Sequence, residues 1–319
     1  MEEHDLLATS WTSAGALRAG DGEDRAPSPV PIDVRIRAVV DAGFSGIGLD
    51  TEDLCQARQT IGFSVLRRRL DDAGIVWIQL GTLDDWWTDG PRRAASDADR
   101  VLLLEAAAML RATQILVAAD TVTPCTNPGA MTRDWLRLAD QAEEVGAEIV
   151  LEAVPWSNLS TVEQASRFVA SAGHPNGGIL VDAMHAFRGG STLASMRSGI
   201  DPSTLLAVEL SDGVLVPTPE TVPADESRDG RIVPGSGAWD LVGFIRVMRE
   251  LGFDEPWGVE VANPAHRALP VQDALSRAAA ATRAVLDASD AIGTPAVPPM
   301  PSTPAPVSAV DLDLPSTPV

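Results

Sequence analysis

The feature that most constrains this chain is a unit that recurs along it. A short apolar run is followed by a polar loop and then by an amphipathic segment that ends in glycine. Such ends fall at Gly43, Gly74, Gly146, Gly173 and Gly252. Glycine just past a helix accepts the left-handed backbone conformation that closes the last turn. Each amphipathic segment is therefore predicted to be a helix that leads into the next strand.

The apolar runs between these helices predict eight strands. Strands that alternate with helices pair in parallel through right-handed crossovers. Eight units of this kind fit a closed (β/α)8 TIM barrel, which we predict for residues 1–287. The strands are expected at Leu6–Thr9, Gly46–Leu49, Val76–Leu80, Gln114–Ala118, Ile149–Ala153, Gly178–Asp182, Leu206–Leu210 and Gly258–Val261.

An open, doubly wound α/β sheet is the alternative arrangement of these elements. Such a sheet requires a glycine-rich turn after an early strand. No G-x-G-x-x-G sequence follows the first predicted strand, so the closed barrel is favoured.

Local signals mark the ends of elements. Ser160 and Glu163 have the spacing of a capping box, which predicts the start of a helix there. Residues 20–31 are rich in Pro and Gly and are expected to form a loop. From residue 288 the chain is dominated by Pro, Ser, Thr and small residues, which bury too little surface to offset the entropy of ordering. Residues 288–319 are therefore predicted to be a disordered tail.

Composition limits the partners and the location. The 319 residues include 24 basic and 45 acidic side chains, for a formal net charge of −21, which disfavours nucleic acid. The N-terminus lacks the features of a signal peptide, and no apolar run approaches the roughly 18–20 residues of a membrane span. The two cysteines form no C-x-x-C pair. We expect a cytoplasmic protein, and the sequence leaves homo-oligomerisation open.

Four acids stand among apolar residues at the ends of the last four predicted strands. They are Glu152 in "IVLEAVPW", Asp182 in "ILVDAMH", Glu209 in "VELSDG" and Glu260 in "WGVEVAN". The C-terminal strand ends of a TIM barrel converge on its active site. Buried carboxylates repel one another unless they are paired or bind a metal. The pattern predicts one divalent cation, Mg²⁺ or Mn²⁺, because both prefer oxygen ligands.

Other side chains near these acids are candidates for substrate contact. His185 follows Asp182 by three residues, in the loop that faces the predicted site. Trp86 and Trp87, in "DDWWTDGPRR", are expected either to form an apolar wall over the strand ends or to pack between a loop and an outer helix. The long connection from Gly213 to Gly237 is interpreted as a lid over the substrate.

The motifs "LEAVPW", "VDAMH", "VELSDG", "PGSGAWDLVGFI" and "WGVEVAN" occur in one order. On these motifs the chain resembles the sugar phosphate isomerase/epimerase family, the xylose isomerase-like TIM barrels, over about residues 5–287. The resemblance implies one Mn²⁺, Mg²⁺ or Co²⁺ held at Glu152, Asp182, Glu209 and Glu260. It also implies substrate contacts from His185 and from Arg231, with Arg188 as a second candidate arginine.

One position departs from the family pattern. The family usually has His on strand seven, where this chain has Glu209, and some dehydratase-like relatives have Gln there. A site with four carboxylates favours Mg²⁺ or Mn²⁺ over Zn²⁺. The alternatives are that Glu209 does not bind metal or that the site is degenerate.

The expected activity is that of a metal-dependent isomerase or epimerase on a small keto-sugar or polyol derivative. Glu152 and Glu260 would transfer the proton as base and acid while the metal stabilises an enediolate. Loss of a β-substituent from the same intermediate would instead give a dehydratase or lyase. A non-catalytic barrel that keeps the metal site is the third reading.

Overall fold

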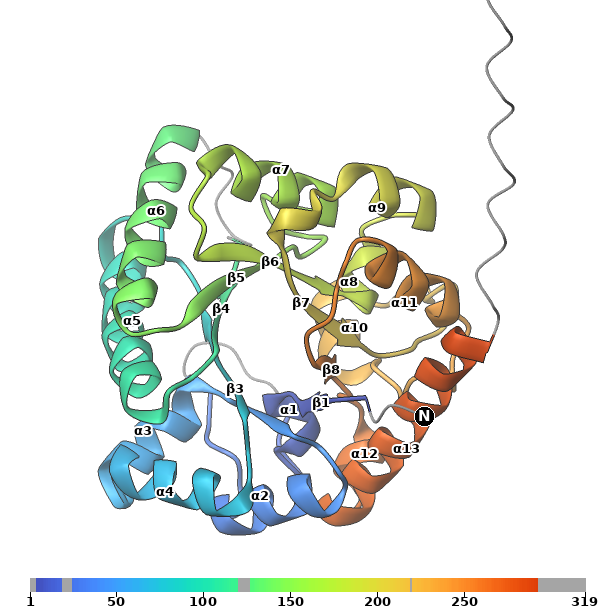
Figure 1. Cartoon of the computed structure of the whole chain (residues 1–319), viewed down its shortest axis with the longest axis horizontal. Coiled ribbons are helices and arrows are strands. Elements are labelled where there is room, and N and C mark those ends of the chain that lie inside the picture. The colour runs from blue at the N-terminus through green and yellow to red at the C-terminus, as the bar shows by residue number, and fades with distance from the viewer. Residues whose placement is uncertain (1–3, 19–24, 120–126, 219, 292–319) are drawn as a thin grey trace, which may run out of the picture.

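The computed structural model describes residues 4–18, 25–119, 127–218 and 220–291. Its eight strands are all parallel and form a closed barrel in which neighbours in sequence are neighbours in space, as Figure 1 shows. The predicted TIM barrel is confirmed, and the open sheet is excluded. The strands are β1 (Leu6–Ala8), β2 (Gly46–Leu49), β3 (Trp77–Leu83), β4 (Gln114–Ala118), β5 (Glu148–Glu152), β6 (Gly177–Asp182), β7 (Leu205–Leu210) and β8 (Trp257–Val259).

Helices surround the barrel and cover its outer face (Figure 1). They are α1 (Ser10–Ser13), α2 (Ile32–Asp41), α3 (Thr51–Thr60), α4 (Phe63–Ala73), α5 (Gly90–Leu110), α6 (Pro128–Glu144), α7 (Val162–Ala172), α8 (Ala183–Arg188), α9 (Leu193–Gly199), α10 (Pro223–Asp229), α11 (Leu241–Glu250), α12 (Pro264–Arg267) and α13 (Val271–Ala291), with a 3₁₀ turn at Pro202–Thr204. No helix of the described part of the chain combines the length and the apolar character needed to cross a membrane.

The buried apolar residues form two layers. The larger layer lies between the strands and the surrounding helices, as expected for this fold. A small cluster of Val150, Leu180 and Ala207 comes from β5, β6 and β7. Two residues further along each of these strands is an acid: Glu152, Asp182 and Glu209. Because side chains alternate across a strand, the acids point to the same side as this cluster.

All eight predicted strands are present, with ends that differ by a few residues. β3 runs three residues beyond its predicted end at Leu80, to Leu83. β8 ends at Val259, so Glu260 lies just past the strand.

The five glycines that were expected to end helices all have positive φ. The predicted capping box is wrong by one residue, because the N-cap of α7 is Thr161, whose side chain accepts from the N–H of Gln164. Gln164 in turn accepts from the N–H of Ser160 at 2.9 Å. Glu163 is thereby released from capping, and its carboxylate accepts from the hydroxyls of Ser191 and Ser195 at 2.8 and 2.7 Å.

The predicted tail starts four residues too early, because α13 continues to Ala291 and buries Ser289. The remainder of that tail, 292–319, lies outside the described residues, as do positions 19–24 at the predicted loop. The rest of that loop, residues 25–31, forms neither helix nor strand.

Glu163 ties α7 to the start of α9, so its carboxylate is expected to stabilise this side of the barrel. Glu163→Gln replaces one acceptor by a donor that faces hydroxyl groups, and we expect a loss of about 1–2 kcal/mol in the free energy of unfolding. Chemical denaturation followed by circular dichroism measures this. Glu144→Gln, at an exposed position on α6, is the control and should change stability by less than about 0.5 kcal/mol. Equal effects in the two variants would refute the role of Glu163.

Candidate active site

The C-terminal ends of β5 to β8 bring the four predicted acids together. Asp182 is paired in register with Glu209, and Glu209 with Gly258 of β8. One carboxylate oxygen from each of Glu152, Asp182, Glu209 and Glu260 lies within 4.8 Å of the others. We call these four residues the carboxylate cluster, and the end of the barrel that carries them the mouth.

Gly258 makes room for this cluster. A Cβ atom at position 258 would lie 2.6 Å from Cγ of Glu209, closer than carbon atoms pack. Because residue 258 is glycine, the Glu209 side chain can lie across the neighbouring strand β8.

Arg231 enters the cluster from the connection that follows β7. Its Nη1 donates to Oδ2 of Asp182 at 2.7 Å and lies 2.9 Å from Oε2 of Glu260. The backbone of Arg231 exchanges two hydrogen bonds with Ala262, so the residue runs beside the chain that leaves β8. The family resemblance implied a substrate contact from Arg231, and the structure places its guanidinium in the carboxylate cluster.

Burial dominates the electrostatics of the cluster. It raises the pKa of Glu152 and of Glu209 well above their usual range, and the neighbouring Glu260 carboxylate adds to both shifts. Burial likewise raises the pKa of Glu260 to about 7, although Arg231 opposes the shift. Burial would lower the pKa of Arg231, but the surrounding carboxylates more than offset it and raise that pKa. One guanidinium thus faces four acids and cannot neutralise them all.

His185 is neutral at neutral pH. Burial lowers its pKa to about 4, against the opposing effect of Asp182. Its backbone N–H donates to Oδ1 of Asp182, which is the N-cap of α8. Nη2 of Arg231 lies 3.1 Å from Nε2 of His185. Arginine can only donate, so Nε2 accepts and the proton resides on Nδ1. That Nδ1 is buried and has no hydrogen-bond partner among the described residues.

The cluster fits a divalent cation on its own geometry. Oε1 of Glu209 is buried without a hydrogen-bond donor from the described parts of the chain. Oε2 of Glu260 is buried too, and its one close cation is Nη1 of Arg231, which is not aligned for a hydrogen bond. Unpartnered buried oxygens are costly, and a hard cation would satisfy them.

Two candidate substrate contacts are occupied within the fold, and for Trp86 this agrees with the alternative expectation that it packs against an outer helix. Trp86 is buried, donates from Nε1 to the carbonyl of Ala118 at 2.7 Å and lies 5.9 Å from the Trp135 ring of α6. Arg188 forms a half-buried ion pair with Glu226 of α10.

Trp156 and Asp212 belong to the mouth, and the sequence did not single out their roles. Trp156 meets His185 edge to face at 5.4 Å between ring centroids, and its signal was the aromatic residue in "LEAVPW". Asp212 accepts from the backbone N–H groups of residues 213, 235, 237 and 239. Its carboxylate therefore holds the "PGSGAW" loop, and the glycines beside it were the available signal.

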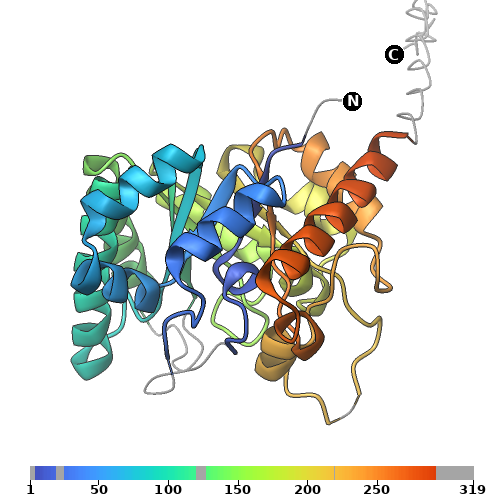
Figure 2. The ribbon, with the colours of Figure 1, turned by 90° about the horizontal axis from the view of Figure 1, so that it is seen from below.

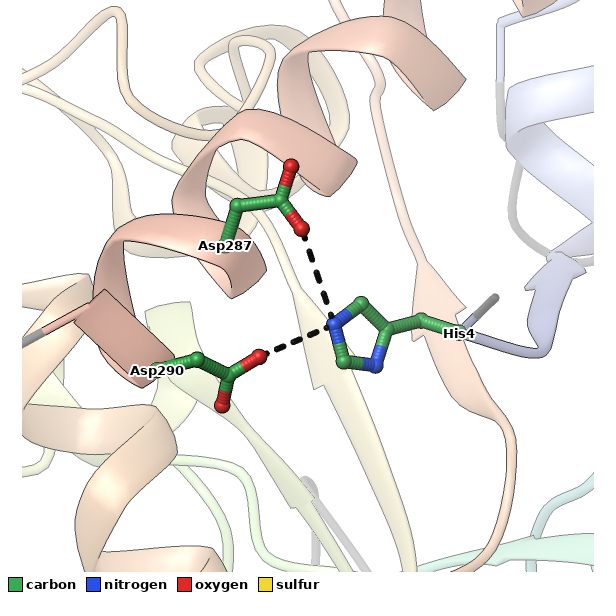
Figure 3. A group of neighbouring side chains, drawn as sticks. All are labelled: His4, Asp287 and Asp290. Carbon is green, nitrogen blue, oxygen red and sulfur yellow. Dashed lines mark ion pairs between the residues drawn. The ribbon is translucent and has the colours of Figure 1, made fainter. Parts of the chain in front are cut away.

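Other groups of potential ligands lie on the surface. Nε2 of His4 is 3.2 Å from Asp290 and 3.8 Å from Asp287, as Figure 3 shows, and both aspartates are half exposed. Asp290 also pairs with Arg249. This group fastens the start of β1 to α13. A third group, Asp140, Glu143 and His174, joins α6 to the turn after α7 and is largely exposed.

Comparison with known proteins agrees with this geometry. A family model described as xylose isomerase-like TIM barrel matches residues 36–285. The chain belongs to this family. An inosose isomerase of Bacillus velezensis is 30% identical over 151 residues, 47% of this chain and 52% of the relative. A 3-dehydroshikimate dehydratase of Pseudomonas aeruginosa is 26% identical over 250 residues, 75% of this chain and 37% of the relative.

Solved structures share the xylose isomerase-like fold. The IOLI protein with a bound zinc atom has a TM-score of 0.72 at 18% identity and covers 89% of this chain and 99% of its own. D-psicose 3-epimerase with D-fructose has a TM-score of 0.64 at 18% identity, with coverages of 81% and 94%. The chain spans about half the length of the inosose isomerases that it matches. The relatives named here are an inosose isomerase and a 3-dehydroshikimate dehydratase, and one of the solved structures is a sugar epimerase.

Glu209→Gln should separate metal binding from folding. The pKa of Glu209 is raised in the folded state, so its contribution to stability is full at low pH and is lost as pH rises through the folded pKa. At about pH 8 the free energy of unfolding of the metal-free variant should exceed that of the metal-free parent by about 1–3 kcal/mol, and the difference should be small near pH 4. Mn²⁺ affinity, measured by calorimetry, should fall at least about tenfold.

Glu148→Gln is the control, because burial raises the pKa of Glu148 at the opposite end of β5. It should have no effect on Mn²⁺ affinity. Unchanged Mn²⁺ binding by Glu209→Gln would remove Glu209 from the ligands.

Proposed function

We propose that the protein is a metal-dependent isomerase or epimerase of a small keto-sugar or polyol derivative. The observation that carries this proposal is the buried cluster of four carboxylates with unpartnered oxygens beside a neutral imidazole and one guanidinium. Glu152, Asp182, Glu209 and Glu260 would hold one Mn²⁺ or Mg²⁺. A bound divalent ion would polarise a substrate carbonyl and stabilise the negative charge left by removal of the α-proton.

The residues of the mouth have matching tasks. Glu152 and Glu260 come from strands on either side of the cluster and have raised pKa values, which suits carboxyl groups that take and return a proton near neutral pH. Nδ1–H of His185 has no hydrogen-bond partner among the described residues and would be available to donate to a substrate oxygen. Trp156 offers an aromatic edge beside His185. Burial of these groups excludes water and strengthens each polar contact with the substrate.

Dehydration is a second candidate, and one comparison favours it. The 3-dehydroshikimate dehydratases match 75% of this chain, whereas the inosose isomerases match 44–47%. Both reactions begin with removal of a proton next to a carbonyl. They differ in whether a carboxyl group returns the proton to carbon or protonates a leaving hydroxyl group.

Exchange of substrate hydrogen with deuterated solvent tests the shared step. With Mn²⁺ present, proton NMR is expected to show exchange at the carbon next to the carbonyl in at least one of D-fructose, D-psicose, D-tagatose, L-ribulose or inosose. Glu152→Gln and Glu260→Gln should each slow exchange at least about 100-fold, because each removes a proton-transfer group. Glu148→Gln should exchange at the parent rate.

The products decide between the candidates. A keto-sugar with an altered centre or carbonyl position supports the isomerase or epimerase. Loss of water from 3-dehydroshikimate without exchange in the sugars supports the dehydratase. Absence of exchange and of dehydration across the panel would contradict both and favour a non-catalytic barrel.

A further inference from the structure

Helix α10 lies in the connection between β7 and α11, and none of its seven residues is buried. In Figure 2 this connection (gold) projects on the side away from the C-terminal end of α13. A short helix without buried apolar surface gains little from propensity or packing. Its position must depend on polar contacts, which come from Arg18, Arg188 and Arg267.

Arg188 makes the most protected of these contacts. Its Nε and Nη2 both donate to the carboxylate of Glu226. The same guanidinium donates to the carbonyls of Val214 and Leu215 at 2.7 and 3.2 Å and lies 5.2 Å from the centre of the Trp239 ring. The side chains of Arg188 and Glu226 are 14% and 10% exposed, whereas Arg18 is 45% exposed. The Arg267 side chain is 13% exposed, but its partner Asp229 is 31% exposed. Exposed ion pairs contribute little, so the pair of Arg188 and Glu226, in which both partners are shielded, is the most protected contact of α10.

The residue after Glu226 reaches the carboxylate cluster through Arg231. The carbonyl of Ser227 accepts from Nε of Arg231 at 3.0 Å, and its hydroxyl accepts from Nη2 at 3.2 Å. The opposite side of the same guanidinium meets Asp182 and Glu260. An unbroken series of contacts thus runs from Arg188 through Glu226 and Ser227 to Arg231 and the cluster.

We propose that Arg188 and Glu226 are positioning residues that fix the guanidinium of Arg231 against the carboxylate cluster and thereby set its affinity for a divalent cation. This inference rests on the proposed metal site. The guanidinium of Arg231, held within the cluster, repels a divalent cation that binds there, and the repulsion is strong where water is excluded. When the contact between Arg188 and Glu226 is broken, α10 loosens, Arg231 withdraws and a cation binds more tightly.

Glu226→Gln and Arg188→Lys test this assignment. Titration with Mn²⁺ should show binding tighter by about 3- to 10-fold than in the parent. Hydrogen–deuterium exchange read by mass spectrometry should be faster in residues 223–231. Glu220→Gln is the matched control, because Glu220 is an exposed acid in the same connection. It makes the same change of charge as Glu226→Gln and should alter neither measurement.

Ser227→Ala keeps the carbonyl contact and removes the hydroxyl, so it should tighten Mn²⁺ binding in the same direction by a smaller factor. It serves if the stronger variants fold poorly. Mn²⁺ binding that is weaker than, or equal to, that of Glu220→Gln in all three variants would overturn the proposal. So would a raised KM of Arg188→Lys with unchanged Mn²⁺ affinity, because that result assigns Arg188 to substrate contact.

The measurements distinguish failure of the metal site from failure of the positioning role. If the parent protein binds no Mn²⁺, the proposed metal site fails, and the cation-affinity role of Arg188 is overturned with it. Faster exchange in residues 223–231 would then still demonstrate that Arg188 holds α10. If the parent binds Mn²⁺ and the variants leave exchange unchanged, the positioning role is overturned while the metal site stands.

Discussion

The contact between Arg231 and the carboxylate cluster is the interaction on which the mouth of the barrel depends. Four acids meet there because four neighbouring strands each place one at the C-terminal end. The barrel is closed, so the backbone positions that carry these side chains cannot move apart without disrupting strand pairing. A single guanidinium relieves part of their repulsion and leaves two carboxylate oxygens without a donor among the described residues. The excess of carboxylates over positive charge lowers stability when the cluster is empty, and the same excess provides affinity for a cation.

Much of this arrangement could be predicted from the sequence because it follows from repetition. Eight apolar runs between helices that end in glycine define the barrel, and a two-residue period places Glu152, Asp182 and Glu209 above the small apolar layer. Arg231 was predicted from resemblance alone. Nothing in the pattern of strands and helices specifies how the long connection after β7 folds back toward the cluster. The contacts of Arg231 with Ser227 and Glu260 therefore became visible only in the structure.

Other contacts could not be predicted from the sequence because the spacing of the residues allows more than one pairing. Ser160 and Glu163 have the spacing of a capping box, but a shift of one residue gives Thr161 and Gln164 the capping roles and leaves Glu163 to accept from two serines. Trp86 lies close to a strand end in sequence, which allowed a wall over the strand ends or packing against an outer helix, and its indole is buried against Trp135 of α6. Sequence spacing fixes which residues are near one another, and packing decides which contact each side chain makes.

Asp212 has a consequence for how this barrel can change. Its carboxylate binds four main-chain N–H groups and, among the described residues, no side chain, so it recognises the course of the backbone at residues 213 and 235–239 rather than particular side chains. Gly237 is held to glycine, because a Cβ there would lie 2.2 Å from the Asp212 carboxylate. Outside the residues that hold Arg231, the intervening segment can therefore vary in length and sequence while both of its anchors stay in place. Such a segment is an exchangeable part through which one barrel can be adapted to different substrates.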